Sequence, residues 1–302
     1  MSKKKILVTG ANGYIGRHVV TALLDMDCEV IASDFAFDGV DERAIRNETP
    51  IFSDDPELFD KMGRPDACIH MAWRNGFQHN AETHITDLPN HYLFLKNMME
   101  GGLKQVAVMG TMHEIGYWEG AITENTPANP ISLYGIAKNA LRQITIQLAK
   151  KKGVILQWLR AYYILGDDLK NNSIFSRIVK LEQEGSPTFP FTSGKNKYDF
   201  INVDELAAQI SAATIQTEVQ GIINCCTGNP ASLADKVEEF IKEKNYKIRP
   251  EYGAFPDRPY DSPGVWGDPE KINQIMKNCS KNMAIMIIVE VDMIWYFQSH
   301  KK

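Results

Sequence analysis

Short apolar runs alternate with amphipathic stretches through the first half of the chain. The runs at residues 5–9, 28–34, 66–72, 106–110 and 153–160 are mostly apolar, which is typical of strands buried on both faces. A helical period follows Arg17, and it recurs in two separate segments, residues 81–100 and 131–152. Strands joined by helical crossovers of this length predict an α/β fold with a Rossmann-like, doubly wound parallel sheet.

The alternation becomes less regular after about residue 166. Helices are expected over residues 172–184, 203–215 and 231–244, and short strands over 188–191, 198–201 and 221–226. We therefore expect a Rossmann domain at residues 1–165, whose sheet also takes segments near 198–226. Residues 166–200 and 227–302 are expected to form a smaller C-terminal substrate-binding lobe. The apolar stretch 283–297 fits a buried helix or a strand equally well.

Composition narrows the class of protein. The chain is 44% hydrophobic and 24% charged, as soluble globular proteins are. A net charge of −5 gives no general attraction to nucleic acid or to anionic membranes. Neither a signal peptide nor a membrane-spanning stretch is evident. The five cysteines, with Cys225 next to Cys226, lack CxxC spacing, so we expect reduced thiols and a cytoplasmic location.

The first strand enters its helix through a glycine turn. Glycine recurs every third position in Gly10-Ala11-Asn12-Gly13-Tyr14-Ile15-Gly16. Such a turn lets backbone N–H groups and a helix N-terminus approach a pyrophosphate closely. Asp34 ends the second strand, at about the spacing expected of a carboxylate that binds a ribose. An ordinary βα turn is the alternative, but the acid favours dinucleotide binding, with NAD preferred over NADP.

Candidate catalytic residues lie at the end of the fourth strand and after it. Tyr134 and Lys138 are four residues apart near the start of the long helix, so they share a face. We expect the ammonium to lower the pKa of Tyr134 toward working pH, making the phenol a general acid or base, while Lys138 also binds a ribose. Thr111 ends the fourth strand, where its hydroxyl could bond a substrate oxygen. The alternative, a helix-start tyrosine and a solvated lysine, is disfavoured by the glycine turn upstream.

The carboxyl ends of parallel strands share one edge of the sheet, where ligands bind in such folds. Besides the glycine turn, Asp34 and Thr111, this edge should carry Met71, Ala72, Trp73 and Tyr162. We expect these residues to contact the cofactor.

Taken together, the chain resembles the extended short-chain dehydrogenase/reductases of the NAD-dependent epimerase/dehydratase family, which act on nucleotide sugars. The matching motifs cover nearly the whole chain: residues 9–16, Asp34, Asp54, 70–72, Thr111, 134–138, 198–205 and 258–261. The resemblance implies tightly held NAD, a nucleotide diphospho-sugar substrate and a catalytic set of Thr111, Tyr134 and Lys138. It also implies that Asp54 holds the adenine, and that helices 81–100 and 131–152 form a homodimer contact.

Departures from the family pattern limit the activity. Family dehydratases carry an Asp-Glu pair directly after the threonine, whereas this chain has Met112 and His113, so it lacks the acid/base pair of a dehydratase. His113 is either an acid, base or substrate contact, or a solvated loop residue.

Diphosphate contacts also differ. Tyr198 replaces a family arginine that grips the diphosphate, leaving Lys195 or Lys197 as substitutes. Arg258 matches a second such arginine. Asn172 stands where the family uses an asparagine near the diphosphate, or else it caps a helix.

A metal site is not expected. His70, His79, His84, His91 and His113 lie on different elements and lack the cysteine or carboxylate partners that zinc spacing requires.

The preferred function is an NAD-dependent oxidoreductase of a nucleotide diphospho-sugar, most simply a 4-ketosugar reductase or 4-dehydrogenase of the 6-deoxysugar type. A nucleotide-sugar 4-epimerase that retains its NAD is the alternative. A third reading is a non-catalytic NAD sensor, although such proteins typically lack the Tyr-Lys pair.

Overall fold

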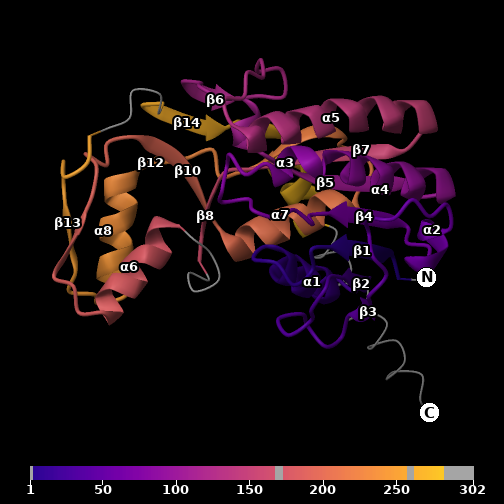
Figure 1. The fold of residues 1–302 in the computed structure, drawn as a ribbon, viewed down its shortest axis with the longest axis horizontal. Helices are drawn as coiled ribbons and strands as arrows, with labels where there is room; N and C mark the ends of the chain where they lie inside the picture. Colours follow the sequence, from indigo (N-terminus) through magenta and orange to yellow (C-terminus); the bar gives the residue numbers. More distant parts are fainter. Residues whose placement is uncertain (1–2, 167–172, 257–261, 282–302) are drawn as a thin grey trace, which may run out of the picture.

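A seven-stranded parallel sheet forms the centre of the structure (Figure 1), a computed structural model that describes residues 3–166, 173–256 and 262–281. The strand order is β11-β7-β5-β4-β1-β2-β3, and every neighbouring pair is parallel. The strands are β1 (Lys5–Thr9), β2 (Glu29–Ser33), β3 (Ile45–Asn47), β4 (Ala67–His70), β5 (Gln105–Thr111), β7 (Ile155–Ala161) and β11 (Gly221–Cys225). The expected doubly wound sheet is confirmed; the short, partly polar edge strand β3 was not expected.

Successive side chains of the central strands enter two separate cores. Ile6 and Val8 pack on one face of the sheet with residues of α1 (Gly16–Asp25) and α7 (Val203–Ile215). Leu7 points to the opposite face, where it joins Phe94 and Leu141 of α4 (Leu88–Gly101) and α5 (Leu133–Lys152), next to α2 (Leu58–Lys61). Burying each large apolar side chain contributes roughly 1.5–3 kcal/mol, so the two layers make the sheet a rigid frame.

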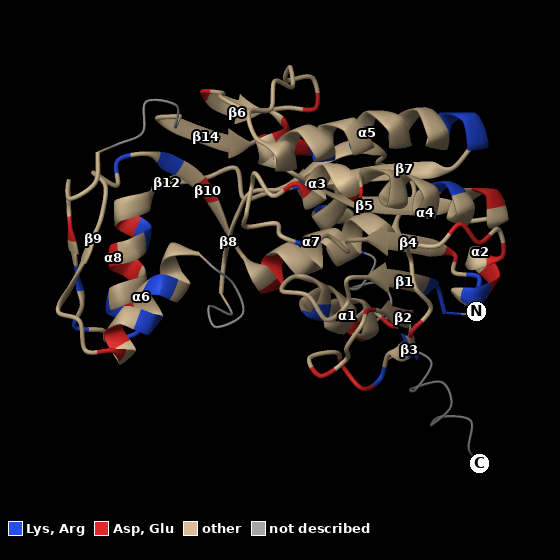
Figure 2. Ribbon diagram, in the orientation of Figure 1, with Lys and Arg blue, Asp and Glu red and all other residues tan. Residues whose placement is uncertain are grey.

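The long helix α5 begins and ends for local reasons. The Ser132 hydroxyl caps it by accepting a hydrogen bond from the Gly135 N–H at 3.2 Å. Gly153 ends it with a left-handed φ of 65°. Lysines at positions 150–152 occupy the last turn, where positive charge suits the helix dipole (Figure 2). The helix expected over residues 131–152 is therefore confirmed, apart from its first two residues.

The prediction of one continuous helix over residues 81–100 was wrong. The structure has a single turn, α3 (Thr83–Thr86), and then α4 from Leu88. Pro89 lies in the first turn of α4, where its missing N–H is tolerated, and it would interrupt a longer helix. Asp87, between the two helices, accepts a hydrogen bond from Arg74 at 2.7 Å.

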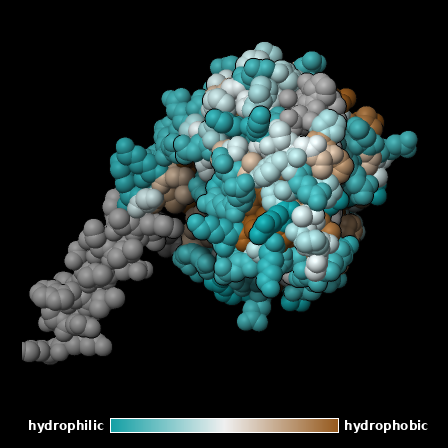
Figure 3. Space-filling view, turned by 90° about the vertical axis from the view of Figure 1, so that its left-hand side faces the viewer, coloured by the Kyte–Doolittle hydropathy of each residue, from teal (hydrophilic) through white to brown (hydrophobic). Residues whose placement is uncertain are grey.

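The remaining elements form a smaller region, whose outer part with α6 and α8 lies at the left of Figure 1. A second sheet has the order β12-β10-β14-β6, with β8 also pairing with β10, and β9 and β13 pair separately. These elements are β6 (Gly120–Ile122), β8 (Tyr163–Leu165), α6 (Ile174–Gln183), β9 (Thr188–Pro190), β10 (Lys197–Asn202), β12 (Pro230–Ser232), α8 (Leu233–Glu243), β13 (Arg249–Glu251) and β14 (Gly264–Gly267), and residues 270–281 are also helical. The face seen at this end is mostly hydrophilic (Figure 3).

Of the segments near residues 198–226, β11 joins the main sheet and β10 joins the second sheet. The domain boundaries themselves stay a prediction, and the stretch 283–297 lies outside the described residues. Within the described ranges, none of the helices combines the length and the hydrophobicity needed to cross a bilayer.

Candidate active site

The glycine turn brings the ends of β1 and β4 into contact. Gly10 has a φ of +71°, and a Cβ there would stand 2.8 Å from the backbone nitrogen of Ala72. A Cβ at Gly16 would stand 2.0 Å from the Gly10 carbonyl oxygen. Only glycine fits either position, so the turn can pack closely against the end of β4, and α1 begins directly after it at Gly16. A helix N-terminus at such a turn can bind an anion.

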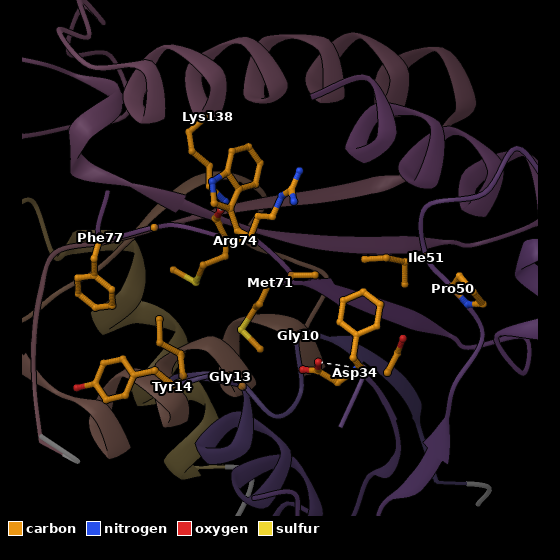
Figure 4. A pocket seen from close by; sticks show the side chains of 18 of the residues that line it. Gly10, Gly13, Tyr14, Asp34, Pro50, Ile51, Met71, Arg74, Phe77 and Lys138 are labelled. Atoms are coloured by element: carbon orange, nitrogen blue, oxygen red, sulfur yellow. Dashed lines mark hydrogen bonds between the residues drawn. The ribbon is translucent and has the colours of Figure 1, made fainter. Parts of the chain in front are cut away.

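A cavity of about 460 Å³ opens beside this turn, at the carboxyl ends of the central strands (Figure 4). Its lining includes most of the residues expected from the sequence to hold the cofactor: Gly10, Gly13, Tyr14, Ile15, Gly16, Asp34, Met71, Ala72, Trp73, Tyr134 and Lys138. In Figure 4, Asp34, Ile51 and Pro50 lie toward one side and Lys138 and Phe77 toward the other. The structure thus brings the glycine turn and the Tyr-Lys pair to one cavity.

The Asp34 carboxylate is oriented by backbone. It accepts hydrogen bonds from the N–H groups of Asn12 at 2.8 Å and Phe35 at 2.7 Å. Phe35 is 97% exposed and lines the cavity together with Pro50 and Ile51. A fixed carboxylate beside apolar surfaces suits the ribose and the flat base of an adenosine, so this end fits NAD. Phe35, Pro50 and Ile51 were not predicted from the sequence, although Phe35 directly follows Asp34.

Lys138 is enclosed at the other end of the cavity. It is 3% exposed, and its Nζ donates a hydrogen bond to the Met109 carbonyl oxygen at 2.8 Å. The same nitrogen lies 3.9 Å from the centre of the Trp73 ring, a cation–π contact. Burial lowers the pKa of Lys138 to about 7, while the negative charge of Glu114 acts in the opposite direction.

The expected lowering of the Tyr134 pKa is wrong. Burial raises the pKa of this phenol to about 12, although its hydrogen-bonding interaction with Thr111 opposes the rise. Tyr134 and Lys138 do line the same cavity, but the ammonium is directed at Met109 and Trp73. Tyr134 is therefore a protonated donor at neutral pH.

His113 packs against Tyr134 instead of facing solvent. Its ring centre lies 4.3 Å from that of His79 and 6.0 Å from that of Tyr134, and His79 stacks on the phenol at 5.5 Å. Burial lowers the pKa of His113 to about 4. His113 is thus partly buried against His79 and Tyr134 and is not a fully solvated loop residue. A neutral imidazole can donate one hydrogen bond and accept another.

His84 and His91 contact Trp73, and His70 lies behind His91. His70 bonds Thr9 at 2.8 Å and His91 at 2.9 Å, and burial lowers the pKa of His70 to about 3. His91 stacks on Trp73 at 4.3 Å, and the Trp73 indole N–H donates to His84 at 3.0 Å. Among the described residues no group of three or more metal-binding side chains occurs. These histidines act as packing and hydrogen-bonding partners.

Some expected cofactor residues lie outside the cavity lining. The Asn12 side chain bonds Asp38 and the Gly39 N–H instead. Asp54 is exposed, and the lining near it comes from Glu48, Thr49, Pro50 and Ile51. Tyr162 is buried, and its hydroxyl donates to Asn224 at 3.1 Å.

The expected substrate residues are more scattered. Thr111 is buried next to Tyr134 and outside the cavity lining, and Lys197 is exposed at the start of β10. Asn172 and Arg258 lie outside the described residues.

A buried carboxylate also went unnoticed in the sequence. Glu114, the last residue of the short helix η1 (Met112–Glu114), is 0% exposed and accepts a hydrogen bond from the Thr111 N–H. Its position in a polar loop gives no sign of this burial.

Comparisons with known proteins agree with this geometry. Residues 6–226 match the model of the NAD dependent epimerase/dehydratase family. The chain is 46% identical over 269 residues to the dTDP-6-deoxy-L-talose 4-dehydrogenase (NAD(+)) of Aggregatibacter actinomycetemcomitans, covering 87% of this chain and 98% of that protein. It is 24% identical to the UDP-glucose 4-epimerase of Lactobacillus helveticus, covering 99% and 98%.

A solved structure shares the fold. The UDP-N-acetylglucosamine 4-epimerase of Methanobrevibacter ruminantium superimposes with a TM-score of 0.79 at 20% identity, over 91% of this chain and 92% of that one. The chain belongs to the NAD-dependent epimerase/dehydratase family of extended short-chain dehydrogenases/reductases.

Proposed function

We propose that this enzyme is an NAD-dependent 4-dehydrogenase of a nucleotide-linked 6-deoxysugar, equally a 4-ketosugar reductase in the reverse direction. The observation that carries the proposal is the cavity that both Asp34 and the Tyr134–Lys138 pair line, with Asp34 and Lys138 toward opposite sides (Figure 4). The 46% identity to a dTDP-6-deoxy-L-talose 4-dehydrogenase supports the substrate class.

Different residues along the cavity bind different parts of the cofactor. The N–H groups at the glycine turn bind the pyrophosphate, and Asp34 accepts hydrogen bonds from the adenosine ribose. Lys138 binds the second ribose, beside Trp73. Bound NAD supplies the hydride acceptor, or, when reduced, the hydride donor.

Tyr134 handles the proton. In reduction, its Oη gives the proton to the sugar's keto oxygen as hydride adds to carbon 4, so the C=O becomes CH–OH. Oxidation is the reverse step: the phenolate must accept the proton of the C4 hydroxyl as the hydride leaves, so oxidation should be faster at alkaline pH. The pKa of about 12 makes the phenol the stable form, which suits a proton donor. Thr111, buried outside the cavity lining, orients the phenol through the hydrogen bond between their side chains, and His113, kept neutral beside Tyr134, bonds a sugar hydroxyl.

The proposal is tested with dTDP-6-deoxy-L-talose and NAD, following NADH absorbance and analysing the sugar product. We expect NADH to form in proportion to the keto sugar. Tyr134→Phe should lower kcat by roughly 100-fold or more while NAD still binds. Tyr252→Phe, at an exposed position, serves as the matched control. A new 4-epimer without net NADH would show the epimerase alternative, and unchanged kcat in Tyr134→Phe would refute the catalytic assignment.

The epimerase alternative has weaker support, because the UDP-glucose 4-epimerase relative is only 24% identical. A non-catalytic sensor does not agree with the retained Tyr134–Lys138 pair or with the dehydrogenase relative.

We also propose a homodimer formed through α4 and α5. Ile136 and Ile144 are exposed large apolar residues of α5, with Ile85 on the neighbouring α3. Such surface favours association when several apolar side chains lie on one helical layer. Sedimentation equilibrium should give twice the chain mass, and Ile136→Arg should shift it toward monomer; a monomeric parent protein would contradict the proposal.

A cytoplasmic location is proposed from the thiols. All five cysteines are free, including the buried neighbours Cys225 and Cys226. Free thiols are typical of proteins in reducing compartments.

A further inference from the structure

Glu114 places a carboxylate in the interior, directly behind the catalytic set. Its exposed fraction is 0%. A buried carboxylate is costly unless hydrogen bonds and opposite charges surround it. Here both oxygens lie within 3.0 Å of the Trp158 indole nitrogen, which donates to them, and Oε1 also accepts the Thr111 N–H at 2.8 Å.

Two arginines supply the opposite charge. Arg142 Nε lies 3.3 Å from Glu114 Oε2, and Arg160 Nη2 lies 3.6 Å from the same oxygen. Arg160 is held from its other side by the Thr123 carbonyl oxygen at 3.3 Å and by Asn224 at 3.4 Å. The carboxylate is therefore fixed by partners that are themselves fixed.

These partners come from three separate elements. Thr111 ends β5, Trp158 and Arg160 belong to β7, and Arg142 lies one turn beyond Lys138 on α5. The carboxylate thus joins the strand that carries Thr111 to the helix that carries the Tyr-Lys pair. Its charge also acts on the pKa values of both members of that pair.

The backbone of β5 lies close to both Glu114 and Trp158 at Gly110. A Cβ at Gly110 would stand 2.2 Å from the Trp158 indole nitrogen and 2.6 Å from Glu114 Oε1. The approach of carboxylate and indole to β5 therefore requires glycine just before Thr111.

We propose that Glu114 is a positioning residue of the reaction: its buried carboxylate fixes Thr111 in the geometry that Tyr134 needs. Glu114 touches neither substrate nor cofactor, and it acts through the backbone of Thr111. The inference rests on the proposed role of Thr111 beside Tyr134.

The test is a double-mutant cycle in the intact enzyme, using Glu114→Gln, Thr111→Ala and the double variant. The amide keeps the size of Glu114, but it removes the charge and turns one acceptor into a donor facing Thr111 and Trp158. We expect Glu114→Gln to lower kcat by roughly tenfold or more, the range for losing hydrogen bonds to a charged group. The sugar KM and NAD dissociation constant should change by less than about threefold.

The cycle separates positioning from general damage. If Glu114 acts through Thr111, Glu114→Gln should change kcat by less than about twofold when Thr111 is already alanine. Glu243→Gln, at an exposed site on α8, is the matched control. Trp158→Phe keeps an aromatic side chain and removes the indole N–H together with the five-membered part of the ring; it should show a smaller kcat loss with the same non-additivity, and it decides the question if Glu114→Gln does not fold.

The possible outcomes point to different failures. Multiplicative losses in the cycle, or unchanged kcat in Glu114→Gln, would overturn the positioning role. A Thr111→Ala variant with full activity would instead refute the catalytic set on which the inference rests.

Discussion

The buried ammonium of Lys138 should make the stability of the enzyme depend on pH. The perturbation is Lys138→Met, which keeps much of the side-chain volume and removes the titrating group. In the folded protein burial lowers the pKa of Lys138 to about 7, whereas in the unfolded chain it should be close to 10.5. Between these values the unfolded state binds more protons, so the free energy of unfolding must rise with pH.

The magnitude follows from the two pKa values. Below pH 7 both states carry the proton, and the charge destabilises the fold by about 5 kcal/mol. This penalty falls as pH rises from about 7 toward 10.5. Between pH 6.5 and 8.5 the lysine should add about 2 kcal/mol to the free energy of unfolding. Burial also lowers the pKa values of His79 and His113, but those residues are present in both proteins, so their contribution cancels in the comparison.

The assay is urea unfolding of NAD-free protein at pH 6.5, 7.5 and 8.5. Lys138→Met should be the more stable protein at pH 6.5, and its advantage should shrink by about 2 kcal/mol at pH 8.5. Lys150→Met, exposed on the same helix, is the matched control and should show no such change. If the free energy of unfolding had the same pH slope in the parent protein and in Lys138→Met, the reasoning would be refuted, because burial would then not destabilise the charged form of Lys138.

Two further changes test the ends of the site. Phe35→Ala should raise the NAD dissociation constant by roughly fivefold or more, because a stacked base loses its aromatic partner; an unchanged value in a fluorescence titration would argue against adenosine at this end. Gly110→Ala should lower the melting temperature by several degrees, since its Cβ would stand 2.2 Å from the Trp158 nitrogen and overpacking costs about 1–3 kcal/mol. Calorimetry that found no loss would mean that β5 can move away from Trp158.

The parts of the fold that the sequence predicts are those set by local patterns. Central parallel strands are buried on both faces, so β1, β4, β5 and β7 appear as predominantly apolar runs. The edge strand β3 (Ile45–Asn47) has a largely polar sequence with two exposed residues, so the same criterion overlooks it. The break between α3 and α4 was not predicted, because the apolar period continues across Pro89. The proline itself was visible in the sequence and argues against one continuous helix.

The same division holds in the site. The glycine turn and the four-residue spacing of Tyr134 and Lys138 are local, and both reach the cavity as expected. Phe35 and Ile51 meet there only because β2 and the segment after β3 are neighbours, which no short motif records. The packing of His113 and His79 on Tyr134 likewise depends on three separate elements.

The error in the Tyr134 pKa shows why spacing alone was insufficient. Two residues four apart on a helix share a face, but the effect of a charge depends on where its atom ends and on what surrounds it. Lys138 directs its ammonium to Met109, and burial then dominates both groups, raising one pKa and lowering the other. Glu114 is the nearby charge that acts on both: it favours the protonated form of the lysine and of the phenol. Glu114, which the sequence places in an ordinary loop, thus helps to set the protonation of Tyr134 and Lys138. The chemistry of this site therefore depends on the buried residues behind the cavity as much as on the residues that line it.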